Sequence, residues 1–165
     1  QPNRSVGGVA SSANGLLSRL EPVRTADHSL PGRIKGRGVL LAHFGDDRQG
    51  LTVAVAHLSL GAKSRHAQLS FIAEVLQDHP NALLMGDFNC LPDQPEMEVL
   101  YRNTGLRPPE CQVPTFPSWK PARAIDHILI SGDLKCLGTR AVAAAFSDHL
   151  ALAMEVEVPE QALRG

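Results

Sequence analysis

A chain of 165 residues has the length of one domain with a buried core. Its net charge of −1 argues against a protein that coats nucleic acid by bulk electrostatics, although a nuclease with a local basic patch is still allowed. No apolar run is long enough to span a membrane and no signal peptide is recognisable, so we expect a cytoplasmic protein.

The N-terminal part is predicted to be mostly irregular, and clear strand patterns begin after it. The first forty residues are rich in Gly, Ser and Pro, and one apolar segment at 16–19 is predicted to be a short strand. Residues 39–44 and 51–58 are apolar runs separated by a Gly-Asp-Asp turn. They are predicted to be two buried strands that can pair as a hairpin.

A helix is predicted at residues 64–77. Its apolar residues recur at helical spacing and form one stripe, at positions 69, 72, 73 and 76. Ser64 is a candidate N-cap, and Pro80 ends the helix. A short apolar strand at 82–85 is expected to follow.

The C-terminal half alternates between loops and strands. A second helix is expected to begin at Asp93, because the run Asp-Gln-Pro-Glu offers an N-cap, an early proline and a capping-box glutamate at Glu96. Residues 103–123 are predicted to be a loop that holds five prolines. Strands are expected at 124–131 and 150–158.

The remaining segment, 141–146, is predicted to be a loop or a short strand. The mixed order of strands and helices indicates an α+β fold. Three cysteines without a CxxC pair suggest neither a zinc cage nor a disulfide framework. They are expected to be free thiols in a reducing compartment.

Ionisable side chains stand at the ends of the apolar strands. They are His57, the Gly-Asp-Phe-Asn run with Asp87 and Asn89, and the two Asp-His pairs at 126–127 and 148–149. Each alone also fits an ordinary turn or a core histidine. Asp87 and Asn89 are two residues apart, so in an extended chain they share a face. Four such motifs in one domain favour a common site at the edge of the sheets.

The residue types suit phosphoester cleavage. Carboxylate and amide oxygens are the ligands that magnesium or manganese prefers. Cleavage also requires an activated water and a group that titrates near neutral pH, and histidine fits that second role. The sequence has no Walker loop, nucleophile elbow or His-Glu-x-x-His helix, so other hydrolytic centres have no support.

These motifs, in this order, resemble the endonuclease/exonuclease/phosphatase superfamily. The resemblance runs from about Gly15 to Val158 and includes Arg65 and Gln68 on the predicted helix, as well as the Gly-Leu-Leu-Ser-Arg segment from Gly15. It implies a metal-dependent phosphodiesterase or phosphatase that requires Mg²⁺ or Mn²⁺. The fold it implies is part of a four-layer α/β/β/α sandwich, with helices outside two mixed β-sheets.

The resemblance also implies residue roles. His57 would hydrogen-bond the scissile phosphate, and Asp87 would position the attacking water and contact the metal. Asn89 would contact a phosphoryl oxygen or the metal. Asp126 would orient His149, which would act as the general base or stabilise the pentacovalent phosphate.

Further positions follow from the same resemblance. Asp148 would bind or orient a metal, whereas His127 is assigned no catalytic role. Residues 115–119 lie where many members have a substrate-facing loop. Trp119, Lys120 and Arg123 are therefore candidates for stacking on the substrate and docking its phosphates.

The sequence departs from the family pattern at its N-terminal side. An early strand with an asparagine and a later strand that ends in Gln-Glu, whose glutamate is the family's principal metal ligand, are absent. Residues 1–165 are therefore expected to be this domain without its N-terminal portion, which a missing segment or another chain would complete.

The sequence does not identify the substrate. Nucleic acid, a phospholipid head group and a small phosphorylated metabolite are all candidates. The alternative to an enzyme is a non-catalytic fragment or binding module that keeps the fold without the metal site.

Overall fold

The computed structural model describes residues 2–6, 9–32, 36–46, 48–143 and 146–163. Its central element is a five-stranded sheet of order β3-β4-β5-β6-β7. These strands are β3 Arg24–Ser29, β4 Gly38–Phe44, β5 Leu51–Ala56, β6 Asn81–Asp87 and β7 Asp126–Ile130. Strands β5 and β6 are parallel and the other neighbours are antiparallel, so the sheet is mixed.

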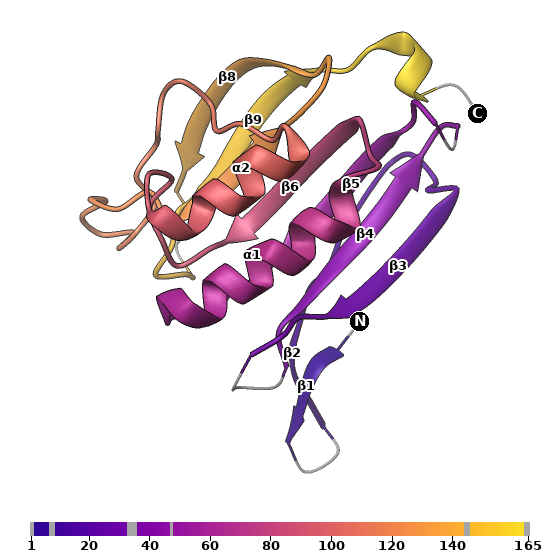
Figure 1. Ribbon diagram of the computed structural model, residues 1–165. Coiled ribbons are helices and arrows are strands. Elements are labelled where there is room, and N and C mark those ends of the chain that lie inside the picture. The colour runs from indigo at the N-terminus through magenta and orange to yellow at the C-terminus, as the bar shows by residue number, and fades with distance from the viewer. Residues whose placement is uncertain (1, 7–8, 33–35, 47, 144–145, 164–165) are drawn as a thin grey trace.

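Two helices cover one face of this sheet (Figure 1). They are α1 Ala62–Leu76 and α2 Glu98–Thr104, the latter preceded by the 3₁₀ turn η1 Pro95–Met97. Between the helices and the sheet lies an aliphatic core in which Leu69, Ile72 and Leu84 are fully buried. The scarcity of aromatic residues explains this composition, because leucine, isoleucine and valine must supply the buried area.

Two short antiparallel pairs complete the described structure. They are β1 Pro2–Val6 with β2 Val9–Ala13, and β8 Lys135–Val142 with β9 Ala151–Glu157. Val156 packs with Phe44 and Leu51 of the central sheet, so the β8-β9 pair lies on the face opposite the helices. A 3₁₀ turn, η2 Glu160–Leu163, follows. The α+β class and the layered arrangement of helices outside β-sheets are confirmed.

Most predicted elements are present, with shifted ends. The hairpin of β4 and β5, helix α1 and strands β6, β7 and β9 all agree with the sequence pattern. Ser64 does not cap α1, because the helix begins earlier and its N-cap is Gly61. Glu96 does not close a capping box. Its carboxylate accepts hydrogen bonds from the buried Arg65 side chain instead.

The strand expected at 16–19 is wrong. That segment has no regular pairing, and Leu17 is fully exposed beside the apolar groove over the central sheet. Strand β3 was not predicted, because its exposed edge position permits a polar sequence without alternation. Of the segment 141–146, which was expected to be a loop or a short strand, residues 141 and 142 form the end of strand β8, and residues 144 and 145 lie outside the described residues.

The described residues contain no helix that is long and apolar enough to cross a membrane.

The three cysteines are free, and they differ in environment. Cys90 is buried, and burial raises the pKa of its thiol to about 11. Because the thiolate is the reactive form, Cys90 is expected to resist alkylation in the folded protein. Iodoacetamide at pH 8 should modify the exposed Cys111 and Cys136 quickly, and Cys90 only after denaturation. Mass spectrometry of native and unfolded samples measures this, and rapid native alkylation of Cys90 would contradict the buried position.

Candidate functional site

The candidate site lies where β5, β6 and β7 present neighbouring ends. His57 follows β5, Asp87 is the last residue of β6, and Asp126 is the first residue of β7. Because β5 and β6 are parallel and β7 is antiparallel to β6, these three ends meet at one edge of the sheet. Asp87 and Asp126 are direct partners in the β6-β7 register. The sequence signal of polar residues at strand ends therefore corresponds to a real juxtaposition.

Close approach of β5 and β6 at this edge requires a glycine. Gly86 has φ of 142°, and a Cβ at that position would lie 1.8 Å from the carbonyl oxygen of Ala56. Only glycine adopts this conformation without strain and leaves that space free. Gly86 thereby allows Asp87 to reach His57, whose Nε2 lies 3.3 Å from Asp87 Oδ2.

The Asp87–Asn89 turn is held by its own side chains. Asp87 Oδ1 accepts a hydrogen bond of 2.9 Å from the backbone N–H of Asn89. Asn89 has a positive φ of 55°, which asparagine tolerates better than most residues, and its Nδ2 donates to the carbonyl oxygen of Leu58. The amide group thus ties the turn after β6 to the segment after β5 and leaves its Oδ1 as the acceptor for a ligand.

His149 is oriented by Asp126. Its Nδ1 donates to Asp126 Oδ2 over 2.7 Å, which agrees with the orienting contact that the family resemblance implies. Thr115 Oγ1 donates to the same carboxylate oxygen over 2.5 Å. The Phe116 ring packs against the His149 ring with centroids 4.8 Å apart. With Nδ1 engaged, Nε2 is the ring nitrogen that can face a substrate.

A group of three potential ligand atoms results. Asp87, Asp126 and His149 each offer one ligand atom, and these atoms all lie within 4.8 Å of one another. Asp148 is not part of this group. Its side chain is exposed, and its backbone carbonyl accepts a hydrogen bond from the N–H of Ser118.

Helix α1 fixes the segment that follows His57. Gln68 is fully buried; its Oε1 accepts from the backbone N–H of Ser59, and its Nε2 donates to the Ser59 hydroxyl. The Arg65 guanidinium donates to the carbonyl oxygens of Ser59 and Leu60. These contacts give Arg65 and Gln68 a positioning role that residue-type reasoning alone does not reveal.

The loop of residues 115–123 bridges the two Asp-His pairs. Ser118 donates through its hydroxyl to the carbonyl of Ser147, and the Leu150 N–H donates to the carbonyl of Thr115. Sequence reasoning missed Thr115 and Ser118 as supporting residues, because hydroxyl residues in a proline-rich loop give no distinct pattern.

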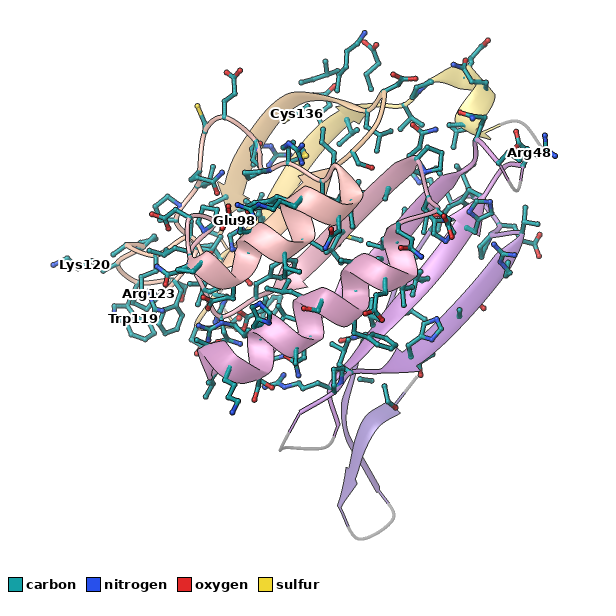
Figure 2. The ribbon with its side chains drawn as sticks, viewed as in Figure 1. Arg48, Glu98, Trp119, Lys120, Arg123 and Cys136 are labelled. Atoms are coloured by element: carbon teal, nitrogen blue, oxygen red, sulfur yellow. The ribbon has the colours of Figure 1, made fainter. Side chains whose placement is uncertain are left out.

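The predicted substrate contacts lie on this loop and point outward. Figure 2 shows Trp119, Lys120 and Arg123 projecting together at the left edge of the molecule. The Trp119 side chain is 76% exposed. The Arg123 guanidinium lies 5.9 Å from the centroid of the Phe116 ring, which in turn contacts His149. The loop therefore connects these exposed groups to the cluster through Phe116.

His127 is a structural residue. It is buried, its Nε2 bonds the carbonyl of Cys90 over 2.8 Å, and its ring lies 5.0 Å from that of Phe88. Burial holds the pKa of His127 below its usual value, because desolvation disfavours the imidazolium.

The pKa values of the two histidines in the site are shifted in opposite directions. Burial lowers the pKa of His149, but the hydrogen bond and charge of Asp126, with Asp87 and Asp148, outweigh it, so that pKa is raised. Burial lowers the pKa of His57, and the positive charge of Arg37 adds to this effect, so its pKa is lowered despite Asp87.

The histidine titration order tests these environments in protein free of metal. As pH rises, His57 should lose its proton first and His149 second, which ¹H–¹⁵N correlation spectra of the rings can follow. Because its folded pKa is raised above 6.5, His149 adds stability that is present at low pH and lost as pH rises through that folded value. The contribution of His57 has the opposite sign. Asp126→Asn should lower the pKa of His149, and an unchanged value would contradict the pairing.

Comparison with known proteins assigns the chain to a family. The model of the endonuclease/exonuclease/phosphatase family matches residues 3–149, and the chain therefore belongs to this family. The resemblance carried by the sequence motifs is thereby confirmed. No curated protein sequence matches the chain.

Solved structures share the fold at low identity. A protein of unknown function from Enterococcus faecalis is 22% identical with a TM-score of 0.69, over 83% of this chain and 66% of that one. A mannosyl-6-phosphatase from Bacteroides thetaiotaomicron is 17% identical with a TM-score of 0.71, over 84% and 67%. The human Nocturnin catalytic domain with bound sulfate is 20% identical with a TM-score of 0.63, over 83% and 59%. The chain thus spans about two thirds or less of these structures.

Proposed function

We propose that this chain carries the reaction centre of a divalent-metal-dependent phosphoester hydrolase. The observation that carries the proposal is the convergence of Asp87, Asp126 and His149 within 4.8 Å, with His57 beside Asp87. Carboxylates that lie beside an oriented histidine supply both a metal ligand set and a group for proton transfer. Membership of the endonuclease/exonuclease/phosphatase family supports this class of chemistry.

His149 acts as the base or as the stabiliser of charge on phosphorus. Its Nδ1 donates to Asp126, so the opposite ring nitrogen can take a proton from the attacking water or donate to a phosphoryl oxygen. His57 serves as a hydrogen-bond donor to the scissile phosphate. Its lowered pKa favours the neutral ring, which donates one hydrogen bond without adding a full charge.

Asp87 and Asn89 would hold the metal and position the attacking water, and Asp148 would assist from its exposed position. The donors are carboxylate and amide oxygens, which fit Mg²⁺ or Mn²⁺ better than softer cations. When bound, the cation neutralises negative charge on the phosphoryl oxygens. Asp87 accepts a hydrogen bond from the N–H of Asn89 and lies near His57. Its carboxylate is therefore preorganised toward the position where the cation and the scissile phosphate would bind.

The substrate carries a phosphoester next to a group that the 115–123 loop can contact. Trp119 offers a ring for stacking, and Lys120 and Arg123 offer positive charge for additional phosphates. Nucleic acid, a phospholipid head group and a small phosphorylated metabolite all have this chemistry.

A further segment of the longer protein completes the fold and the metal site. The face of the central sheet opposite the helices carries apolar grooves of about 280 and 490 Å³, lined by residues that include Phe44, Leu51 and Leu83. Leu17 and Leu20 are exposed beside them. An apolar face of this size needs a covering layer. We propose that a preceding segment, which carries the Asn and Gln-Glu motifs of the family, covers this face of the sheet.

The experiment that tests the function is a substrate screen of the encoded full-length protein. Phosphodiesters and phosphomonoesters are incubated with Mg²⁺, with Mn²⁺ and with a chelator. Hydrolysis that requires the metal supports the proposal. Turnover that persists undiminished in chelator contradicts it, and a chain that binds phosphoesters without cleaving them is a binding module.

A further inference from the structure

Three large apolar side chains are exposed beside the candidate site. The exposed fractions are 79% for Leu60, 76% for Trp119 and 93% for Phe146. Leu60 lies three residues after His57, and Phe146 lies three residues before His149. Trp119 lies on the loop that contacts the His149 ring. Single exposed apolar residues are common on protein surfaces, but several gathered at one site indicate an interaction surface.

Two hydrogen bonds place Trp119 and Phe146 on adjoining loops. The Ser118 hydroxyl donates to the carbonyl oxygen of Ser147 over 2.8 Å, and the Ser118 N–H donates to the carbonyl oxygen of Asp148 over 2.7 Å. Trp119 follows Ser118 in the chain, and Phe146 precedes Ser147. The backbones that carry the two apolar side chains are therefore held next to each other.

Leu60 lies at the same edge of the molecule. It stands between β5 and α1, and its carbonyl oxygen accepts a hydrogen bond from the buried Arg65 side chain. Its backbone is thus held while its side chain is exposed. The N-terminal end of α1 and the arrowhead of β6 face the side on which Trp119 projects (Figure 1 and Figure 2). Leu60, Trp119 and Phe146 therefore form an apolar rim beside the reaction centre.

Exposed cations adjoin the apolar rim. Lys63 is three residues after Leu60, on the first turn of α1. Lys120 directly follows Trp119, and Arg123 ends the same loop. All three cationic side chains are exposed, and Figure 2 shows Lys120 and Arg123 on the same side as Trp119. The apolar rim is thus bordered by positive charge.

The carboxylates of this edge limit its positive charge. Asp148 precedes His149, and its charge acts on that histidine, so it belongs to the reaction centre. Asp93, on the segment after β6, is exposed as well. Attraction between charges can therefore supply only part of any affinity, and the apolar side chains must supply the rest.

We propose that the apolar rim docks on a phospholipid bilayer and presents the reaction centre to phosphoesters in the head-group layer. The inference rests on the proposed function, and it names a phospholipid head group as the substrate class. Tryptophan is favoured at the boundary between head groups and acyl chains, and leucine and phenylalanine insert into the apolar side of that boundary. Lysine and arginine beside them attract anionic head groups.

A surface that stacks the bases of single-stranded nucleic acid is the competing explanation. It accounts for Trp119 and for the adjoining cations. It does not account for Leu60, whose aliphatic side chain has no ring on which a base can stack. If instead a preceding segment of the longer protein covers the apolar rim, neither a bilayer nor a nucleic acid binds there.

The test is co-sedimentation of the encoded full-length protein with vesicles, in chelator so that no lipid is hydrolysed. Vesicles of phosphatidylcholine with phosphatidylglycerol should bind it more tightly than phosphatidylcholine alone. Leu60→Asn and Phe146→Asn should each weaken binding about tenfold, because each removes one inserted apolar side chain. Leu137→Asn is the matched control. It changes a leucine that is 58% exposed on β8 beside Cys136, away from the apolar rim in Figure 2, and should leave binding unchanged.

The emission of Trp119 locates the contact. Phospholipids with brominated acyl chains should quench the tryptophan emission of the wild type more than that of Trp119→Phe, which keeps an aromatic ring at this position. Single-stranded oligonucleotides should leave this difference unchanged. Quenching of Trp119 by the oligonucleotide and not by the vesicles identifies a base-stacking surface and overturns the proposal.

The apolar rim and the reaction centre can be tested separately. His149→Ala removes the proposed base but no part of the apolar rim, so it should bind vesicles like the wild type. A full-length protein that hydrolyses soluble phosphoesters but binds no vesicles, or whose binding is unchanged in Leu60→Asn and Phe146→Asn, overturns the membrane proposal alone. Binding through the apolar rim without hydrolysis of any phosphoester contradicts the proposed function alone.

Discussion

Replacing His149 by alanine is expected to lower kcat/KM for phosphoester hydrolysis by about a hundred- to ten-thousand-fold in the full-length protein. The imidazole is held by the 2.7 Å bond to Asp126 and by packing on Phe116, so its Nε2 is fixed in one orientation. Because a group that acts in the transition state mainly affects turnover, KM should change much less than kcat. Initial rates over a range of substrate concentrations, at saturating Mg²⁺, measure both.

Two variants control this prediction. Asp126→Asn keeps the side-chain shape but removes the charge that orients His149 and raises its pKa, so it should also lose activity, with a shifted pH profile. His66→Ala changes an exposed histidine on α1 and should leave the rate unchanged. A His149→Ala enzyme within about threefold of wild type would contradict the assigned role, since positioned acid–base groups contribute at least about a hundredfold.

The fold was predictable wherever burial imposes periodicity. Helix α1 and the hairpin of β4 and β5 carry clear stripes or apolar runs, because each has a face packed into the core. Strands β3 and β8 were not predictable. Their residues are mostly exposed, so nothing selects an apolar pattern, and their pairing depends on partners distant in sequence.

The candidate site was predictable where its residues stand in motifs at strand ends. Strand ends at one edge of the sheet, and the loops connected to them, bring together five such residues: His57, Asp87, Asn89, Asp126 and His149. Supporting residues were harder to predict. The sequence around Glu96 matches the capping-box pattern. Its contact with the buried guanidinium of Arg65 arises only from the tertiary fold, so the sequence pattern does not predict it. The same limit applies to the hydrogen bonds that join His43 of β4, Thr52 of β5 and His79 in the segment after α1.

Replacing Arg65 by methionine is expected to lower the free energy of unfolding by about 3–5 kcal/mol. Arg65 and Glu96 form an ion pair whose side chains are only 9% and 6% exposed, with Nη2 2.5 Å and Nε 2.9 Å from the same carboxylate oxygen. The variant leaves the Glu96 carboxylate buried without its partner. It also removes the donors to Ser59 and Leu60 that hold the segment after His57. Urea denaturation followed by circular dichroism measures the loss.

Two comparisons separate the buried charge from simple loss of a contact. The double variant Arg65→Met, Glu96→Leu should recover part of the loss, because no unpaired charge then remains in the core. On α2, the pair of Arg102 and Glu98 has side chains that are 74% and 59% exposed. Arg102→Met should therefore change the free energy of unfolding by no more than about 0.5 kcal/mol, since solvent screens an exposed pair. If Arg65→Met is as mild as Arg102→Met, the Arg65–Glu96 pair is not buried as described. If the double variant is no more stable than Arg65→Met, the cost comes from the lost bonds to Ser59 and Leu60 and not from the stranded carboxylate.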